Sequence, residues 1–569
     1  MPTVAEYLVT RLKQIGIEHV FTIPGDYAAP FIDALDLAKG IERVQNINEL
    51  GCGYAADGYA RFRGVGAACV QYGVGTFSLL NCVAGSFTEF VPVAIISSSP
   101  GATDRILEEE ENILFHHCTG DLLADQKVME HVTVASIVVT EARTAPAQID
   151  AALTAMLTHR RPVYIEVIKS VWKLDCDAPV GKLAAQDLPS DADATESAVE
   201  AAWQRICAAE RPVLFLGVEI HRFGLQPLAQ KLVDLSGLSF TTASLAKTVL
   251  DESQPAFAGT YAGPASPDST NNLMLESDCI VALGTIITDD YLAIMASSFS
   301  KMIRVSHGET RVGLTYYRSV HLKEFLTGLI ARFETHKRPA RIAAKPHQPK
   351  PASNSTSLTY NTFYDTLSAW LAAERLLDSS VLVLGESTSL YVFGNLFGLP
   401  ADSFVSQAAW GSLGHETGSA LGVALGSGKR PFVVAGDGGF MMVCQELSSL
   451  LLQKSNAVIF VLSNRAYAIE QAFVNLDAFK PGGEFAAYDL LPTWDYLALA
   501  QAFGTKGFSV STLSELTKTL SALKNLTGQP ALVEVVIPQK DLAPQLERLA
   551  QLPTSQLKYG RSNLLFRKK

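Results

Sequence analysis

The chain has 569 residues, of which 48% are hydrophobic and 18% charged, and its formal net charge is −11. This length favours several domains over a single core, and the negative charge argues against nucleic acid as a partner, because phosphate binding needs clustered Lys and Arg. No stretch approaches the roughly 20 apolar residues of a membrane span, and the first residues carry no basic leader. We therefore expect a cytoplasmic protein with no membrane partner.

The first part of the chain alternates short apolar runs with helical patterns. Helices are predicted for residues 4–15 and 51–61, and strands for residues 19–23, 44–50, 67–72, 93–96 and 163–167. Such alternation is typical of a doubly wound, open parallel sheet, so we predict an α/β domain over residues 1–180. Asp26 follows the first predicted strand and Glu49 lies near the end of the second, at the edge where open α/β sheets place their ligands.

The middle and final parts repeat the α/β pattern. Residues 186–194 and 337–357 are rich in Pro, Ala, Ser and charged residues, which is typical of linkers. We therefore predict a central domain at 195–336, a linker at 337–357 and a final domain at 358–569, giving three doubly wound domains. Nothing in the central block suggests chemistry.

The eight cysteines occur singly, without a CxxC pair. This spacing predicts neither a zinc site nor a disulfide framework. Most of them fit small core positions, and Cys118 stands out only because it follows two histidines.

The final domain contains the most informative stretch. An apolar run at residues 432–435 leads into Gly436-Asp437-Gly438-Gly439, and a second apolar run at residues 458–462 leads into Asn464. Because parallel strands end at one edge of a sheet, Asp437 and Asn464 can meet there, and their oxygen atoms favour Mg²⁺ over zinc. Backbone N–H groups at Gly438 and Gly439, where a helix begins, suit a phosphate.

Gly436-Asp437-Gly438 followed by Asn464 resembles the thiamine-diphosphate binding motif, with Ser463 replacing the first of two asparagines in that motif. The resemblance implies that Asp437, Asn464 and the main-chain carbonyl of Ala466 bind Mg²⁺. The three-domain pattern resembles the thiamine-diphosphate decarboxylases and acetolactate synthases over essentially the whole chain. It implies a pyrimidine-binding domain, a central domain and a diphosphate-binding domain.

The same resemblance assigns further cofactor contacts. Glu49 matches the glutamate that hydrogen-bonds to the aminopyrimidine and promotes formation of the C2 carbanion. Gly411 falls on the position whose carbonyl accepts from N4′, and Leu413 on the apolar residue that keeps the cofactor bent. Ser387 and Thr388 are expected to donate to the diphosphate, and Ile469 is expected to contact the cofactor.

Four acid–base groups resemble those of pyruvate, indolepyruvate and phenylpyruvate decarboxylases: Asp26, His116, His117 and Glu470. The resemblance implies a carbon–carbon lyase that decarboxylates a 2-oxo acid to an aldehyde and CO₂ through an enamine, with possible carboligation. Neighbouring carboxyl and imidazole groups can share protons, so their titration would belong to the coupled set.

Several alternatives stay open at this point. An acetolactate synthase has the same fold but lacks the paired histidines and binds a flavin dinucleotide, and an idle homologue would lose Glu49 or the metal ligands. Substrate choice is also open. Ile469 and Phe473 flank Glu470, and Tyr391 falls where some pyruvate-specific members carry Trp, yet other segments resemble phenylpyruvate-type enzymes equally well.

The resemblance also implies assembly. Glu49 and Asp437 lie far apart in the sequence, and in this family such groups face one cofactor across a subunit boundary. We therefore expect a homodimer as the minimal active unit, within a homotetramer.

Overall fold

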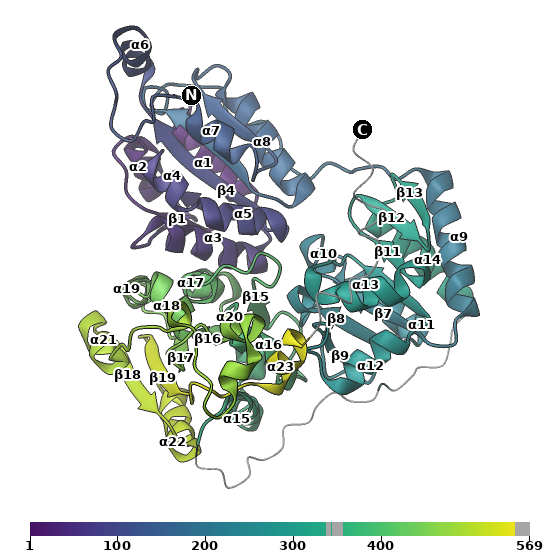
Figure 1. Ribbon diagram of the computed structural model, residues 1–569. Helices are drawn as coiled ribbons and strands as arrows, with labels where there is room; N and C mark the ends of the chain where they lie inside the picture. Colours follow the sequence, from purple (N-terminus) through teal and green to yellow (C-terminus); the bar gives the residue numbers. More distant parts are fainter. Residues whose placement is uncertain (337–342, 344–356, 552–569) are drawn as a thin grey trace.

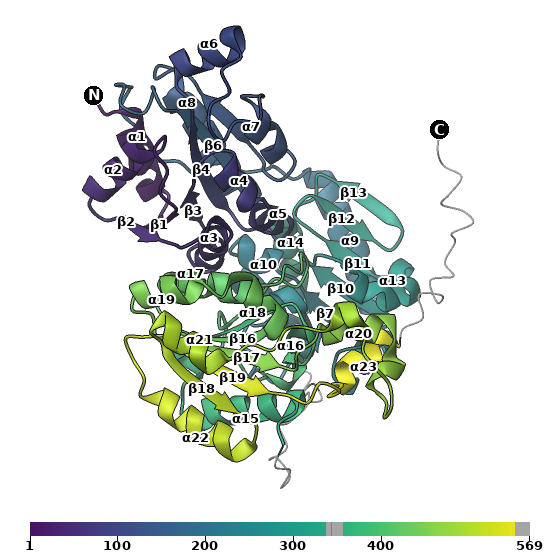
Figure 2. The same ribbon diagram turned by 60° about the vertical axis from the view of Figure 1, so that its left-hand side comes forward.

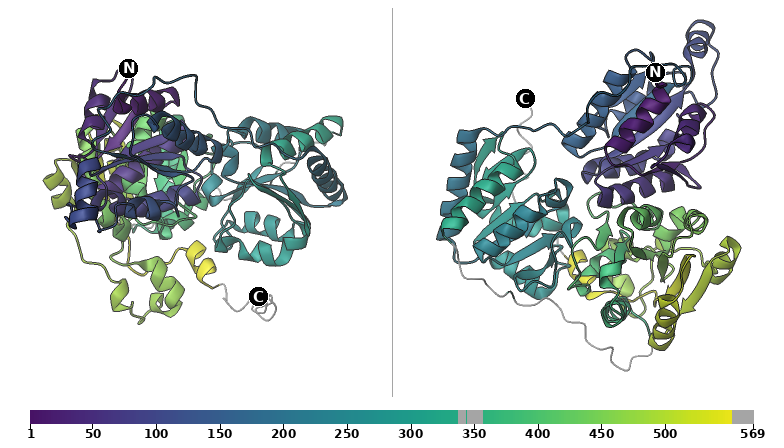
Figure 3. Two further views of the ribbon diagram at one scale, coloured as in Figure 1. Left: turned by 90° about the horizontal axis from the view of Figure 1, so that it is seen from above. Right: turned by 180° about the vertical axis from the view of Figure 1, so that it is seen from behind.

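The computed structural model describes residues 1–336, 343 and 357–551, which form three α/β domains. The N-terminal domain lies above the C-terminal domain, and the central domain lies beside both (Figure 1; Figure 3). The predicted linker at 337–357 falls almost entirely outside the described residues. No helix in the described part of the chain is both long and apolar enough to cross a membrane.

The N-terminal domain has a six-stranded parallel sheet in the order β2-β1-β3-β4-β6-β5. Its strands are β1 (His19–Thr22), β2 (Glu42–Gln45), β3 (Gly66–Cys69), β4 (Val93–Ser99), β5 (Ser136–Val139) and β6 (Val163–Ile168). Its helices are α1 (Val4–Gln14), α2 (Ala29–Leu37), α3 (Glu49–Arg63), α4 (Val74–Ser78), α5 (Leu80–Thr88), α6 (Ala102–Glu111), α7 (Ala124–Met129) and α8 (Ala145–His159).

The strand predicted for residues 44–50 is wrong beyond Gln45. The side chain of Asn48 accepts a hydrogen bond from the backbone N–H of Gly51 and caps α3. Because a capped helix begins at the next residue, Glu49 occupies the first position of α3 rather than a strand end.

The central domain has a seven-stranded sheet in the order β13-β12-β11-β10-β7-β8-β9. Its strands are β7 (Pro212–Leu216), β8 (Phe240–Ala243), β9 (Phe257–Tyr261), β10 (Cys279–Leu283), β11 (Ile303–Val305), β12 (Glu309–Val312) and β13 (Thr315–Arg318). Its helices are α9 (Ala192–Ala208), α10 (Glu219–Arg222), α11 (Gln226–Ser236), α12 (Asp268–Glu276), α13 (Leu292–Ser298) and α14 (Leu322–Thr335).

One edge of the central sheet departs from the parallel arrangement. Strand β12 pairs antiparallel with β11, and a tight turn with Gly313 at φ +62° then folds β12 and β13 into a hairpin. The parallel core from β11 to β9 follows the predicted α/β pattern.

The C-terminal domain has a six-stranded parallel sheet in the order β15-β14-β16-β17-β19-β18, which repeats the topology of the N-terminal domain. Its strands are β14 (Ser380–Leu384), β15 (Phe404–Ser406), β16 (Arg430–Gly436), β17 (Val458–Ser463), β18 (Lys506–Val510) and β19 (Ala531–Val536). Its helices are α15 (Tyr360–Ala373), α16 (Thr388–Tyr391), α17 (His415–Ser427), α18 (Asp437–Val443), α19 (Glu446–Leu452), α20 (Ala468–Val474), α21 (Tyr496–Phe503), α22 (Leu513–Lys524) and α23 (Pro544–Ala550).

Helices α3 and α17 join the two outer domains and face each other between their sheets (Figure 2). The helices approach closely enough that a Cβ on Gly422 would lie 1.7 Å from the carbonyl oxygen of Ala55. Only glycine fits at this crossing, so the contact fixes how the two domains sit relative to each other.

Candidate functional site

A pocket of about 370 Å³ opens at the carboxyl ends of β14, β16 and β17. It collects every cofactor-binding or acid–base residue predicted from the final domain: Ser387, Thr388, Gly411, Leu413, Asp437, Gly438, Gly439, Asn464, Ala466, Ile469 and Glu470. These residues come from separate loops and helices, and they meet because parallel strands end at the same edge of the sheet.

Asp437 opens α18 and is only 3% exposed. One carboxylate oxygen accepts from the N–H of Gly438 at 3.0 Å and the other from the N–H of Arg465 at 2.6 Å. Burial raises the pKa of Asp437 to about 6, although these backbone donors act in the opposite direction. The carboxylate is thus held in one orientation, with lone pairs left for a cation.

Asn464 is fixed on both sides of its amide. Its Nδ2 donates to the Tyr360 hydroxyl at 3.1 Å, and its Oδ1 accepts from the N–H of Ala466 at 3.1 Å. Between them Arg465 has the left-handed φ of +64°, which turns the chain so that Asn464 and Ala466 both line the pocket. A carboxylate, an amide oxygen and a main-chain carbonyl are oxygen donors of the kind that Mg²⁺ prefers.

The turn between β16 and α18 leaves no room for side chains. A Cβ on Gly438 would lie 2.2 Å from the Tyr467 ring, and one on Gly439 would lie 2.7 Å from the Glu416 carboxyl. Bare backbone therefore faces the pocket beside Asp437, as a diphosphate group requires. The residues present fit both the diphosphate and the metal.

Asp26, His116 and His117 gather in the N-terminal domain, away from that pocket. Gln71 donates to Asp26 at 3.1 Å, and Tyr72 donates to the His116 carbonyl at 2.5 Å. The two histidine rings lie 6.3 Å apart between centroids. The consecutive residues Gln71 and Tyr72 thus contact Asp26 and the paired histidines, which brings these groups close together.

Glu49 is also outside the pocket. The turn that precedes Glu49 contacts the C-terminal domain. There, the Glu446 carboxylate accepts hydrogen bonds from the side chains of Asn46 at 2.9 Å and Asn48 at 3.2 Å. Within the described residues of one chain, no hydrogen bond or ion pair links Glu49, Asp26 or the histidines to the Asp437 pocket. In a single chain, the residues predicted to act in catalysis therefore lie in two separate groups, one in the Asp437 pocket and one in the N-terminal domain.

The structure adds residues that were not predicted. Tyr360, Glu386 and Tyr467 also line the pocket. Burial raises the pKa of Glu386 to about 8, one of its oxygens accepts from the Tyr391 hydroxyl at 3.4 Å, and the other has no partner among the described residues. Glu386 comes two residues after the strand predicted at 381–384, so the reasoning applied to Asp437 could have found it.

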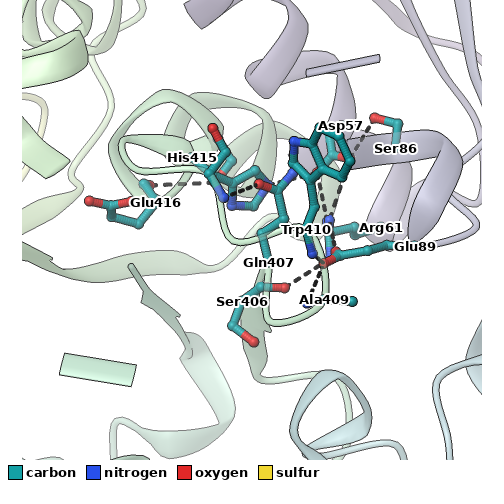
Figure 4. Close-up of polar contacts among 12 residues, drawn as sticks. Asp57, Arg61, Ser86, Glu89, Ser406, Gln407, Ala409, Trp410, His415 and Glu416 are labelled. Carbon is teal, nitrogen blue, oxygen red and sulfur yellow. Dashed lines mark hydrogen bonds and ion pairs between the residues drawn. The ribbon is translucent and has the colours of Figure 1, made fainter. Parts of the chain in front are cut away.

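A buried polar network crosses from the N-terminal domain to the loop that carries Gly411 (Figure 4). Arg61 forms ion pairs with Asp57 at 2.6 Å and with Glu89 at 2.7 Å. Glu89 in turn accepts from the backbone N–H groups of Ala409 at 2.9 Å and Trp410 at 3.1 Å. The N-terminal domain therefore fixes the position of this loop in its own chain.

His415 closes the same network. Its Nε2 lies 2.8 Å from Asp57 Oδ1 (Figure 4). Burial would raise the pKa of Asp57, but Arg61 and His415 outweigh it and hold that pKa below its usual range. The ionised form of Asp57 is thus part of the junction between the two domains.

Comparison with known proteins identifies three domains of one enzyme family in this chain. The N-terminal thiamine pyrophosphate (TPP) binding domain of thiamine pyrophosphate enzymes matches residues 2–127, the central domain matches 199–329, and the C-terminal TPP binding domain matches 391–535. Together these matches cover more than half of the chain.

Relatives match over nearly the full length. A probable pyruvate decarboxylase of Schizosaccharomyces pombe is 29% identical over 566 residues, which cover 96% of this chain and 94% of that protein. A pyruvate decarboxylase of Kluyveromyces lactis is 28% identical, covering 97% of this chain and 98% of that protein. Pyruvate decarboxylase isozyme 3 of Saccharomyces cerevisiae is also 28% identical, with the same coverage. The chain belongs to the thiamine pyrophosphate enzymes and is related to the pyruvate decarboxylases.

Proposed function

We propose that this protein decarboxylates a 2-oxo acid without oxidation, releasing an aldehyde and CO₂, with thiamine diphosphate and Mg²⁺ as cofactors. The observation that carries the proposal is one pocket in which Asp437 and Asn464, suited to a metal, lie beside Glu470, an acid–base group. The full-length relatives named as pyruvate decarboxylases support the same reaction class.

The cofactor contacts follow from the pocket lining. Asp437, Asn464 and the Ala466 carbonyl would hold Mg²⁺, while Ser387, Thr388 and the Gly438-Gly439 backbone would hold the diphosphate. When bound, thiamine diphosphate supplies an electron sink for the electrons left as CO₂ departs. Conversion of a 2-oxo carboxylate to an aldehyde and CO₂ consumes one proton, so the site must deliver one. Glu470, Asp26, His116 and His117 are the groups assigned to hold and move that proton.

The two half-sites of one chain need a partner to become one site. Apolar side chains are exposed on both halves: Ile113 and Leu114 beside the histidines, and Phe473 and Val474 at the end of α20. Exposed apolar groups of this kind are typical of surfaces covered in an assembly. We infer that Glu49, Asp26 and the histidines of one chain complete the Asp437 pocket of a second, in a homodimer that pairs into a homotetramer.

Mixing two inactive variants tests this assembly. Glu49→Gln and Asp437→Ala should each be inactive alone, whereas a hybrid dimer contains one site with both native residues and should recover part of the activity. Dissociated and reassociated mixtures would be assayed, with hybrids isolated by two different affinity tags. Tagged wild-type dimers taken through the same procedure are the control. Isolated hybrids without activity would contradict shared sites.

Aldehyde release from pyruvate, phenylpyruvate and indolepyruvate tests the reaction itself. We expect release that depends on added thiamine diphosphate and Mg²⁺, measured with a coupled alcohol dehydrogenase. In Glu470→Gln, kcat should fall by about 10²–10⁴-fold, the range for general acid–base catalysis. Formation of a 2-hydroxy-2-methyl-3-oxo acid from pyruvate, with no aldehyde, would instead favour the acetolactate-synthase alternative. Absence of every product in the cofactor-loaded protein would favour the idle homologue.

A further inference from the structure

The paired histidines lie on an exposed connection between α6 and α7, and α6 projects from the N-terminal domain (Figure 1). We call residues Phe115–Cys118 the histidine strap. Both histidines are exposed, and the His117 ring meets the Tyr72 ring edge-on, with 6.0 Å between centroids. The strap is also anchored through its backbone and through Cys118, whose thiol donates to Glu108 at 2.7 Å.

The main anchor is the turn that follows β3. The hydroxyl of Tyr72 donates to the His116 carbonyl at 2.5 Å, and the Tyr72 side chain is buried. The next residue, Gly73, lies so close that a Cβ on it would be 2.1 Å from the His117 carbonyl oxygen. Tyr72 thus binds the His116 carbonyl, and the backbone of Gly73 packs closely against the His117 carbonyl.

Asp125 of α7 holds this turn from the other side. Its Oδ2 accepts from the N–H of Gly73 at 2.7 Å and from the Thr76 hydroxyl at 2.5 Å. The carboxyl is 5% exposed. The turn that supports the strap is therefore itself fixed by two hydrogen bonds to a buried carboxylate.

His117 has a left-handed φ of +75°. A residue other than glycine keeps such a conformation only where its surroundings hold it. The peptide between His116 and His117 is the unit that rotates if this conformation relaxes, and its carbonyl is the one that Tyr72 binds. Relaxation of φ at His117 would change how the two imidazoles are oriented relative to each other.

We propose that Tyr72 is a positioning residue for the reaction: by binding the His116 carbonyl, it sets the orientation of His116 and His117 for proton transfer. The inference rests on the proposed function, because it needs those histidines to act on the bound substrate. A misplacement of about 1 Å in a reacting group can reduce a rate by about 10²-fold. Loss of the Tyr72 hydroxyl can therefore lower the rate even though this hydroxyl does not touch the substrate.

Tyr72→Phe tests this, with Tyr7→Phe as the matched control. The Tyr7 hydroxyl is also buried in the same domain and donates to Asp150 at 2.9 Å, far from the strap in the sequence. In Tyr72→Phe we expect kcat to fall by about 10- to 100-fold, with thiamine diphosphate affinity within twofold of wild type. The limb of the pH–rate profile that reports titration of Asp26, His116, His117 and Glu470 should also shift along the pH axis. Tyr7→Phe should leave kcat and the profile unchanged.

Hydrogen–deuterium exchange of the cofactor-free protein gives a readout that does not depend on activity. Peptides covering residues 113–120 should exchange faster in Tyr72→Phe than in wild type or Tyr7→Phe. Asp125→Asn, which weakens the support without removing Tyr72, should show a smaller change in the same direction. If the wild-type protein released no aldehyde, the proposed function would be wrong. The hydrogen–deuterium exchange would still test whether Tyr72 holds the histidine strap through the His116 carbonyl. Unchanged strap exchange, or faster exchange with wild-type kcat and pH profile, would each overturn the role given to Tyr72.

Discussion

Replacing Glu49 by glutamine is expected to slow exchange of the C2 proton of bound thiamine diphosphate by about three orders of magnitude, a loss of about 4 kcal/mol in transition-state stabilisation. Glu49 is assigned to the aminopyrimidine, where its carboxyl drives removal of that proton before any substrate arrives. A glutamine amide keeps the size of the side chain but cannot exchange a proton in this way. The exchange would be started in deuterated solvent and stopped with acid. The C2 proton that remains on the released cofactor would then be measured by NMR.

Three comparison variants sharpen the Glu49 experiment. In Glu470→Gln and His117→Ala, C2 proton exchange should survive while aldehyde release collapses, because these groups act on the substrate. Glu42→Gln changes an exposed glutamate of β2 and should alter neither rate. Normal exchange together with wild-type aldehyde release in Glu49→Gln would show that Glu49 does not activate the cofactor.

Replacing Asp437 by alanine is expected to abolish retention of both cofactors. Asp437 is the one carboxylate among the three proposed metal donors, and its loss removes the charge that offsets a divalent cation. We expect affinity for Mg²⁺ and thiamine diphosphate to fall at least about 100-fold, since even indirect support of a metal ligand is worth about 10–100-fold. Bound cofactor and metal would be quantified after gel filtration.

The pH dependence of metal binding provides a second arm of the same experiment. Burial raises the pKa of Asp437 to about 6 in the metal-free protein. Because the cation binds the ionised carboxylate, protons compete with it, and wild-type affinity should weaken as the pH falls below about 6. Above that pH the affinity should level off, and Asp437→Asn should show no such transition.

Asp477→Asn is the matched control, because Asp477 is an exposed aspartate of the same domain whose ion-pair partner is Lys480. It should retain both cofactors as the wild type does. Full activity of the Asp437→Ala protein after chelation and gel filtration would contradict the metal site.

The sequence predicted that Asp437 and Asn464 meet in the C-terminal domain because the signals for this are local. Apolar runs ending at Gly436 and Ser463 indicate neighbouring parallel strands, and the polar residues that follow such strands must gather at one edge. Asp437 and Asn464 therefore could be placed together without coordinates. The α/β class followed in the same way from alternating strand and helix patterns, and the three domain matches agree with it.

Local patterns were less reliable where a single side chain sets a boundary. The strand predicted for residues 44–50 ends at Gln45, because Asn48 caps a helix and places Glu49 in its first turn. The turn at Gly313 likewise adds an antiparallel hairpin to a sheet whose other signals are parallel.

Contacts between distant residues were decided only by the tertiary structure. Tyr360 reaches Asn464, Glu446 holds the turn of Glu49, and Glu89 fixes the loop before Gly411. Each of these partners is far away in the sequence, and hydrophobic periodicity carries no information about which polar groups meet across domains. The sequence by itself therefore determined the fold class and the residue types of the site. The packing of α3 against α17, and the separation of the predicted catalytic residues into two groups, depended on backbone approach and burial that exist only in the folded molecule.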